Sequence, residues 1–160
     1  HPGESWHLHT IIDDIGAHVD EIHSGMGVTL KLPVVKVHDK RYSLGLDEAE
    51  KAEFLAEMRQ MLTTIQQIMT GIATKDKDMI IKAARYSGNQ MARATPQSVK
   101  DKTPVSFEQI GGPTHMMFEE LIINVEEMDL DDKDDITDLA EFTGKLMRNC
   151  LACHAAFKVD

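Results

Sequence analysis

The chain has 160 residues, which is enough for one domain with a sizeable core. Its formal net charge of −10 argues against nucleic acid or an anionic membrane as the partner, because both attract basic surfaces. No run of residues approaches the apolar length of a membrane span. Aromatic residues make up only 5% of the chain and β-branched alternation is scarce, which is typical of a helical protein.

The first 46 residues are predicted to form a helix and an extended connector. Between residues 4 and 26, apolar residues from Leu8 to Met26 recur at helical spacing. Residues 28–46 are β-prone but interrupted by Pro33, which favours an extended connection packed along the helices that follow. We treat residues 1–46 as an N-terminal extension.

Amphipathic segments with the 3.6-residue period of a helix follow. They span residues 47–73, about 76–94, about 114–129 and about 135–157. Asp47 is a good N-cap for the first segment, and the acidic stretch 129–135 is best explained as capping of the last. Residues 95–113 are rich in Pro and Gly, so we predict an irregular connection there.

The most specific motif is Cys150-Leu151-Ala152-Cys153-His154. This is the C-x-x-C-H pattern of covalent c-type haem attachment, in which two thiols bond to the haem vinyl groups and the histidine ligates iron. On a helix, residues three and four apart share a face, so the three side chains project together.

A thiol redox pair and half of a zinc site are the alternative interpretations of the same motif. A zinc site normally needs further cysteine or paired histidine spacing, and a thioredoxin-type pair needs a βαβ setting. The chain has no other cysteine and no strand–helix alternation around this pair. We therefore predict one covalently attached haem c, with iron bound by His154. Only six residues follow His154, so we expect any sixth ligand to come from upstream.

The helical segments from Asp47 onward, with the haem motif on the last one, resemble the cytochrome c-prime family, the class II cytochromes c. The most specific part of the match runs from Cys150 to Lys158, with an aromatic residue three positions after the histidine and a basic residue four after it. The resemblance implies an all-α protein: an antiparallel four-helix bundle over about residues 47–160, in a single domain of residues 1–160.

In that family, the residue opposite the proximal histidine comes from the first helix of the bundle. Aligning the apolar stripe places Met58 closest to that position, with Met61 one turn further on. Family members with a methionine ligand are electron carriers, whereas others leave the iron five-coordinate and bind nitric oxide or carbon monoxide. The resemblance therefore implies a monohaem electron carrier with His154 and Met58 as axial ligands, and gas binding is the alternative.

We do not expect an enzyme. A haem peroxidase needs a distal acid–base pair, and His18 and His115 are the only internal histidine candidates for one. A c-type cytochrome is normally matured outside the bacterial cytoplasm, and the chain opens at His1 without an export signal. We therefore expect a processed periplasmic protein.

Charge and family resemblance also suggest partners. From Glu119 to Glu141 there are eleven acidic residues against Lys133 alone, which predicts a basic redox partner protein. Members of the cytochrome c-prime family often dimerise through the first bundle helix, so the resemblance also admits a homodimer.

Overall fold

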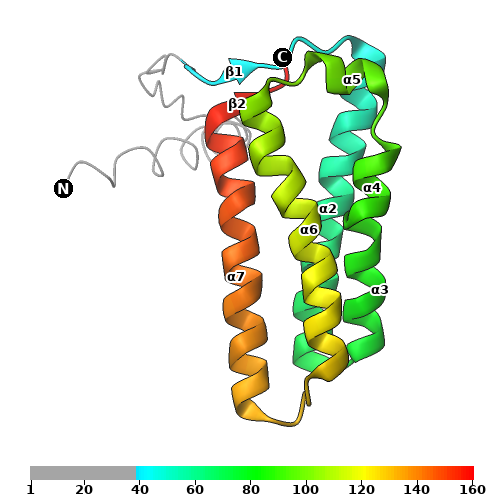
Figure 1. Cartoon of the computed structure of the whole chain (residues 1–160), viewed down its shortest axis with the longest axis vertical. Helices are drawn as coiled ribbons and strands as arrows, with labels where there is room; N and C mark the ends of the chain where they lie inside the picture. The colour runs from blue at the N-terminus through cyan, green and yellow to red at the C-terminus, as the bar shows by residue number, and fades with distance from the viewer. Residues whose placement is uncertain (1–38) are drawn as a thin grey trace, which may run out of the picture. The chain divides into compact units, whose positions relative to one another are not determined.

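The computed structural model describes residues 39–160, and the account below concerns the compact unit from Lys40 to Asp160. The predicted helix at residues 4–26 and most of the predicted connector lie outside the described residues. The described part is mostly helical, with only two very short strands (Figure 1). The prediction of an all-α protein is confirmed for this part of the chain.

The elements follow one another in a simple order. They are β1 (Tyr42–Ser43), α2 (Glu48–Thr74), α3 (Lys77–Ser87), α4 (Asn89–Ala94), α5 (Gln97–Lys102), α6 (Val105–Glu127), α7 (Lys133–Ala156) and β2 (Phe157–Lys158). Helix α3 packs against α2 and α6, and α6 packs against α7, so the long helices lie side by side (Figure 1).

The helices predicted at residues 47–73 and about 135–157 begin where their caps place them. Asp47 accepts hydrogen bonds from the backbone N–H groups of Ala49 and Glu50, and Glu50 accepts one from the N–H of Asp47, which makes a capping box. Asp132 accepts a 2.7 Å hydrogen bond from the Asp134 N–H at the start of α7. Acidic capping of the last helix is therefore confirmed.

Two helix boundaries differ from the prediction. The helix expected at 76–94 is interrupted at Gly88, whose φ of −81° and ψ of −149° are not helical, so it divides into α3 and α4. The connection expected at 95–113 is largely helical, because α5 occupies part of it and α6 already begins at Val105. The prolines do not prevent this. Pro104 immediately precedes α6, where a missing N–H costs nothing, and Pro113 is accommodated inside it.

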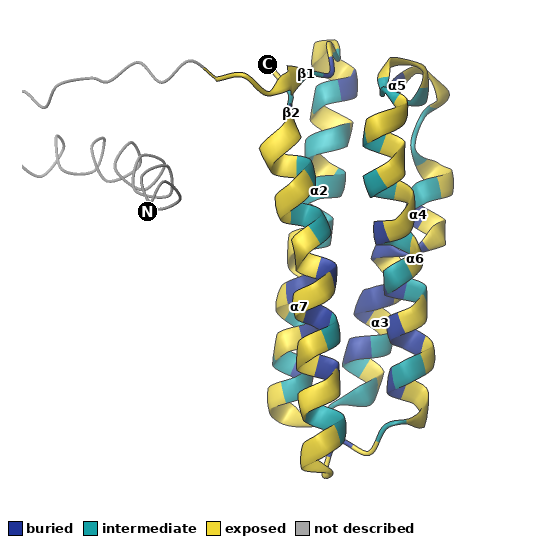
Figure 2. Ribbon diagram, turned by 60° about the vertical axis from the view of Figure 1, so that its left-hand side comes forward, coloured by how far each residue is buried: buried dark blue, intermediate teal, exposed yellow. Residues whose placement is uncertain are grey.

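The core gathers side chains from α2, α3, α6 and α7. Its fully buried members include Ile68, Ile80, Phe118, Leu121, Leu139 and Leu146. Figure 2 shows the buried residues concentrated in the half of these helices that is remote from the β strands. A polar contact also joins α2 to α3, since Ser87 donates a 2.8 Å hydrogen bond to Thr64 Oγ1 and Thr64 donates to the Ala83 carbonyl at 3.3 Å. Among the helices within residues 39–160, none is both long and apolar enough to cross a membrane.

The described end of the connector is extended, as predicted, and packs beside the end of α7. Strand β1 pairs in parallel with β2, and the Leu44 N–H donates a 3.0 Å hydrogen bond to the Lys158 carbonyl. Leu44 is buried, and the Tyr42 and Phe157 rings meet edge to face with centroids 6.2 Å apart. The pairing of β1 with β2 holds the segment that directly follows the cysteine motif.

Candidate functional site

The cysteine motif lies in the last two turns of α7, which ends at Ala156. Cys150, Cys153 and His154 all line one cavity of about 560 Å³. Because α7 is helical through the motif, the three side chains share a face, as their spacing predicts. A cavity of this volume lies within the usual range for cofactor and small-molecule sites, which is about 300–1,000 Å³.

The other walls of the cavity come from α2, the α4–α5 region and α6, and they are mainly apolar. The apolar lining residues are Phe54, Leu55, Met58, Met61, Leu62, Ile65, Ala92, Val99, Phe107, Ile110 and Met147. The rings of Phe54 and Phe107 pack together with centroids 5.9 Å apart, and Phe107 also meets Phe157 edge to face at 5.3 Å. These aromatic contacts hold α2, α6 and β2 around one end of the cavity.

Both predicted methionines reach this cavity. Met58 and Met61 of α2 line it together with His154 of α7, although the two helices are far apart in sequence. A second cavity of about 210 Å³ adjoins the same residues, and its lining includes Met58, Cys153 and His154 but not Met61. Met58 therefore borders both spaces that His154 borders.

The two cysteines are free thiols, and burial raises the pKa of both. The pKa of Cys153 rises to about 11, chiefly through burial and further through the neighbouring Cys150. Catalytic thiols of disulfide oxidoreductases have the opposite property, a lowered pKa that yields a thiolate near neutral pH. The environment of this pair therefore does not favour thiol–disulfide exchange.

Polar side chains also line the cavity. Burial raises the pKa of Glu57, whose carboxylate accepts a hydrogen bond from Thr95 Oγ1 at 3.5 Å. Lys100 of α5 also lines the cavity and interacts electrostatically with Glu57. No functional role was predicted for residues 95–113, because an irregular connection was expected there.

His115 of α6 also lines the cavity, and its orientation is set by the break after α3. Its Nδ1 lies 2.7 Å from the Ser87 carbonyl oxygen. A carbonyl can only accept, so Nδ1 carries a hydrogen, and the neutral ring then has its lone pair on Nε2. In a continuous helix the Met91 N–H would donate to the Ser87 carbonyl, but here it donates to the Gly88 carbonyl instead. The Ser87 carbonyl can therefore accept from His115. Nothing in the spacing of the sequence predicted this pairing.

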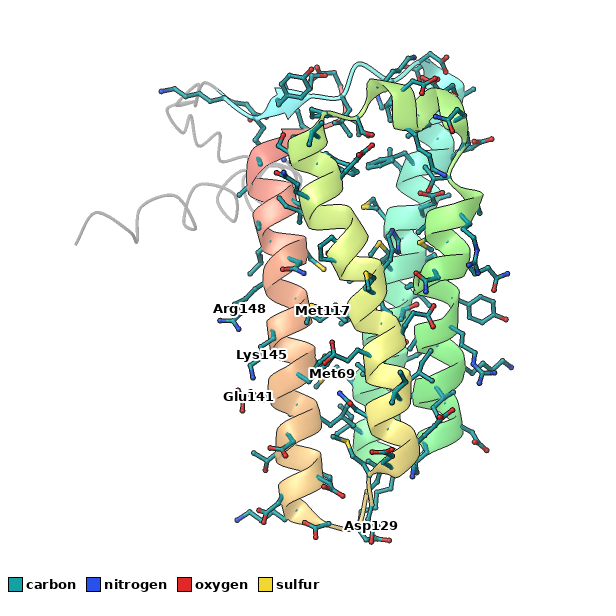
Figure 3. All side chains as sticks on the ribbon, in the orientation of Figure 1. Met69, Met117, Asp129, Glu141, Lys145 and Arg148 are labelled. Atoms are coloured by element: carbon teal, nitrogen blue, oxygen red, sulfur yellow. The ribbon has the colours of Figure 1, made fainter. Side chains whose placement is uncertain are left out.

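The acidic residues before and within α7 lie at the opposite end of that helix from the cysteine motif. Figure 3 shows Asp129 in the turn between α6 and α7, remote from β2. Twenty residues of one helix separate Asp134 from His154, and a rise of 1.5 Å per residue puts them about 30 Å apart. The acidic residues at the start of α7 are therefore close to the cysteine motif in sequence but not in space.

The donor atoms present fit a covalently attached haem better than a bare metal ion. Two thiols and an imidazole share one helix face, thioether side chains lie across an apolar cavity, and aromatic rings close one end. Within residues 39–160, no group of three or more His, Cys, Asp or Glu side chains is arranged to hold a metal ion. Structural zinc requires about four such donors around one point.

The chain matches no protein-family model, and no match is found among curated proteins or solved structures. The site is therefore defined by its own residues and their chemistry.

Proposed function

We propose that the chain is a periplasmic monohaem c-type cytochrome that carries single electrons and is not an enzyme. The haem would be attached through Cys150 and Cys153, with His154 as its proximal ligand. The observation that carries the proposal is that these three residues line a single apolar cavity of about 560 Å³ together with two methionines of another helix. When bound, the haem would supply a reversible one-electron iron couple.

The chain's own residues account for the rest of such a function. The thiols of Cys150 and Cys153 would hold the cofactor covalently, and the His154 imidazole would bind one face of the iron. Phe54 and Phe107 would exclude water from one end of the cavity, which favours a stable redox couple over side reactions. Electron transfer needs no substrate pocket, so this site is complete without a catalytic acid or base.

For the sixth position we propose Met58, as predicted from the sequence, with Met61 one turn away as the alternative. Met58 is supported by its place at both cavities that His154 borders. A thioether ligand stabilises ferrous iron and so raises the reduction potential. If neither methionine binds, the position is open to nitric oxide or carbon monoxide, which is the alternative function.

We further propose that α2, α3 with α4, α6 and α7 form an antiparallel four-helix bundle of the cytochrome c-prime type. The packing order of α2 on α3, α3 on α6 and α6 on α7 supports this arrangement. Hydrogen bonds at matching levels support it too: Thr64 bonds to Ser87, His115 to the Ser87 carbonyl, and Asn149 donates to Met117 Sδ at 3.4 Å. In this scheme the short helix α5 covers the end of the bundle that holds the cavity.

Absorption spectra of three methionine variants test the sixth ligand. The ferric wild-type protein should show the weak near-infrared band of methionine–iron ligation. Met58→Ala should abolish this band, whereas Met61→Ala and the control Met69→Ala should retain it. Met69 is a good control because it lies on the same helix, is 48% exposed and does not line the cavity.

Three other results would change the proposed sixth ligand. Loss of the band only in Met61→Ala keeps methionine ligation but moves the ligand by one turn. A low-spin wild-type spectrum without the band would point to the His115 Nε2 instead. A high-spin ferrous protein that binds carbon monoxide readily would contradict methionine ligation and favour gas binding.

A further inference from the structure

The cavity reaches the protein surface between α2 and α7. Leu62 of α2 and Met147 of α7 both line it, yet they are 70% and 43% exposed. Large apolar side chains that border a cavity and also face solvent mark its opening. Leu151 lies one turn beyond Met147 on α7, between the two cysteines in sequence, and is 66% exposed. We call Leu62, Met147 and Leu151 the mouth patch.

Arginines flank the mouth patch on both helices. Arg59 lies three residues before Leu62 on α2 and lines the cavity, and Arg148 lies three residues before Leu151 on α7 and is exposed. Figure 3 shows Arg148 projecting from the side of α7 that faces away from α6. Neither arginine forms an ion pair with another described residue, whereas the nearby Lys145 is paired with Glu141 at 2.6 Å.

The two arginines give the border of the mouth patch a charge opposite in sign to that of the whole chain. Glu57 and Glu108 line the cavity behind this border, and Glu141 interacts electrostatically with Arg148. The net charge of −10 owes much to the acidic residues between Glu119 and Glu141, many of which lie toward the far end of α7. At 0.1 M ionic strength the Debye length is about 10 Å, much shorter than the separation of about 30 Å along α7. A partner approaching the mouth patch would therefore meet the two arginines while the acidic residues at the far end of α7 are screened.

We propose that the mouth patch is the docking surface for a redox partner protein whose contact surface is apolar and rimmed by carboxylates. This proposal rests on the proposed function, since it requires a haem in the cavity behind the patch. It differs from the sequence-based prediction of a basic partner, which rests on acidic residues that lie mostly remote from the cysteine motif. A small apolar centre between two cations suits the weak, transient contacts of electron-transfer pairs, which bury less than about 1,200 Å².

Stopped-flow kinetics with a plant-type [2Fe–2S] ferredoxin as the probe tests this surface. This acidic donor has a low reduction potential and gives up one electron, which the ferric haem iron accepts without proton transfer. The variant is Arg148→Glu and the matched control is Lys133→Glu. Each changes the net charge by two units on the same helix, and fifteen residues place them about 22 Å apart.

At 0.1 M ionic strength, Arg148→Glu should lower the second-order rate constant about tenfold, and Lys133→Glu should change it less than about twofold. Leu151→Gln should also lower the rate while leaving the absorption spectrum unchanged, because its side chain is 66% exposed and is not among the residues that line the cavity. Equal effects of the two charge reversals would overturn the proposal. Reduction by a basic donor, such as a mitochondrial-type ferrocytochrome c, gives a second test. The proposal would also be overturned if Arg148→Glu accelerated this reaction less than Lys133→Glu did.

Three further outcomes distinguish a failure of the docking proposal from a failure of the proposed function. A wild-type dimer that Leu151→Gln dissociates would assign the mouth patch to a second copy of the chain and overturn partner docking. A wild-type protein without covalent haem would refute the proposed function itself, and docking with it. Normal haem spectra combined with rates that ignore Arg148 would refute docking alone.

Discussion

If the proposed haem fills the cavity, withholding it should unfold this protein or leave it only loosely packed. The experiment compares the same polypeptide made with and without the cellular machinery that attaches haem c. The sequence is therefore identical in the two forms. In the form without haem, the apolar cavity of about 560 Å³ has no occupant to support its walls. Side chains at such a cavity lose contacts that the native packing needs.

The expected magnitude follows from the cavity volume. Empty apolar space in a protein core costs about 24 cal/mol per Å³, so an enclosed cavity of this volume would cost about 13 kcal/mol if its walls did not move. Because this cavity opens to solvent beside Leu62 and Met147, that figure is an upper bound. That upper bound lies within the range of the whole stability of a typical domain, which is about 5–15 kcal/mol. Even if collapse and hydration recover two thirds of it, a loss of about 4 kcal/mol remains, equivalent to roughly 15 °C in Tm.

Circular dichroism melts of the two forms measure this difference, and binding of a hydrophobic dye reports loose packing in the form without haem. The haem-bound form should melt at least about 15 °C higher. A form without haem that melts within about 5 °C of the haem-bound form, with no dye binding, would show that the cavity needs no occupant. That result would refute the reasoning from cavity volume to cofactor.

Three further predictions concern the fold. Phe118→Ala should cost about 3–5 kcal/mol in urea unfolding because this ring is fully buried, and a loss below about 1 kcal/mol would contradict its place in the core. Gly71→Ala should lower Tm, since the added Cβ would lie 2.5 Å from Ile80 Cγ1; an unchanged Tm would contradict that close packing. The hydrogen bond from Lys102 lowers the pKa of Glu50 to about 2. Stability from this depressed pKa is fully present above the unfolded value near 4.5 and is lost as pH falls toward 2. Acid titration of stability in Glu50→Gln should lack this loss, and identical acid profiles would contradict the pairing.

Local signals sufficed for the helices with strong caps and long apolar stripes. Helix α2 begins next to Asp47 as predicted, because the capping box and the apolar period both specify that boundary. The spacing of Cys150, Cys153 and His154 likewise fixed their shared face as soon as α7 was helical. These features depend on residues within a few turns of one another.

The remaining features depend on tertiary contacts that spacing does not encode. Residues 105–113 are helical because α6 packs along α3 and α7, which outweighs the local effect of Pro113 and its neighbouring glycines. The orientation of the His115 ring depends on the Ser87 carbonyl, which the break in the helix at Gly88, 27 residues away, leaves able to accept a hydrogen bond. The opening beside Leu62 likewise appears only when α2 and α7 are placed around one cavity.

The central claim is a covalent haem on Cys150 and Cys153, and the intact mass of the denatured protein tests it most directly. The protein, produced with the haem-attachment machinery, should be heavier than its polypeptide by one haem. After proteolysis, the added mass should lie on the peptide that contains Cys150 and Cys153, and acid–acetone should leave the colour in the protein. A denatured mass equal to that of the polypeptide alone, with the colour extracted into acetone, would contradict covalent attachment.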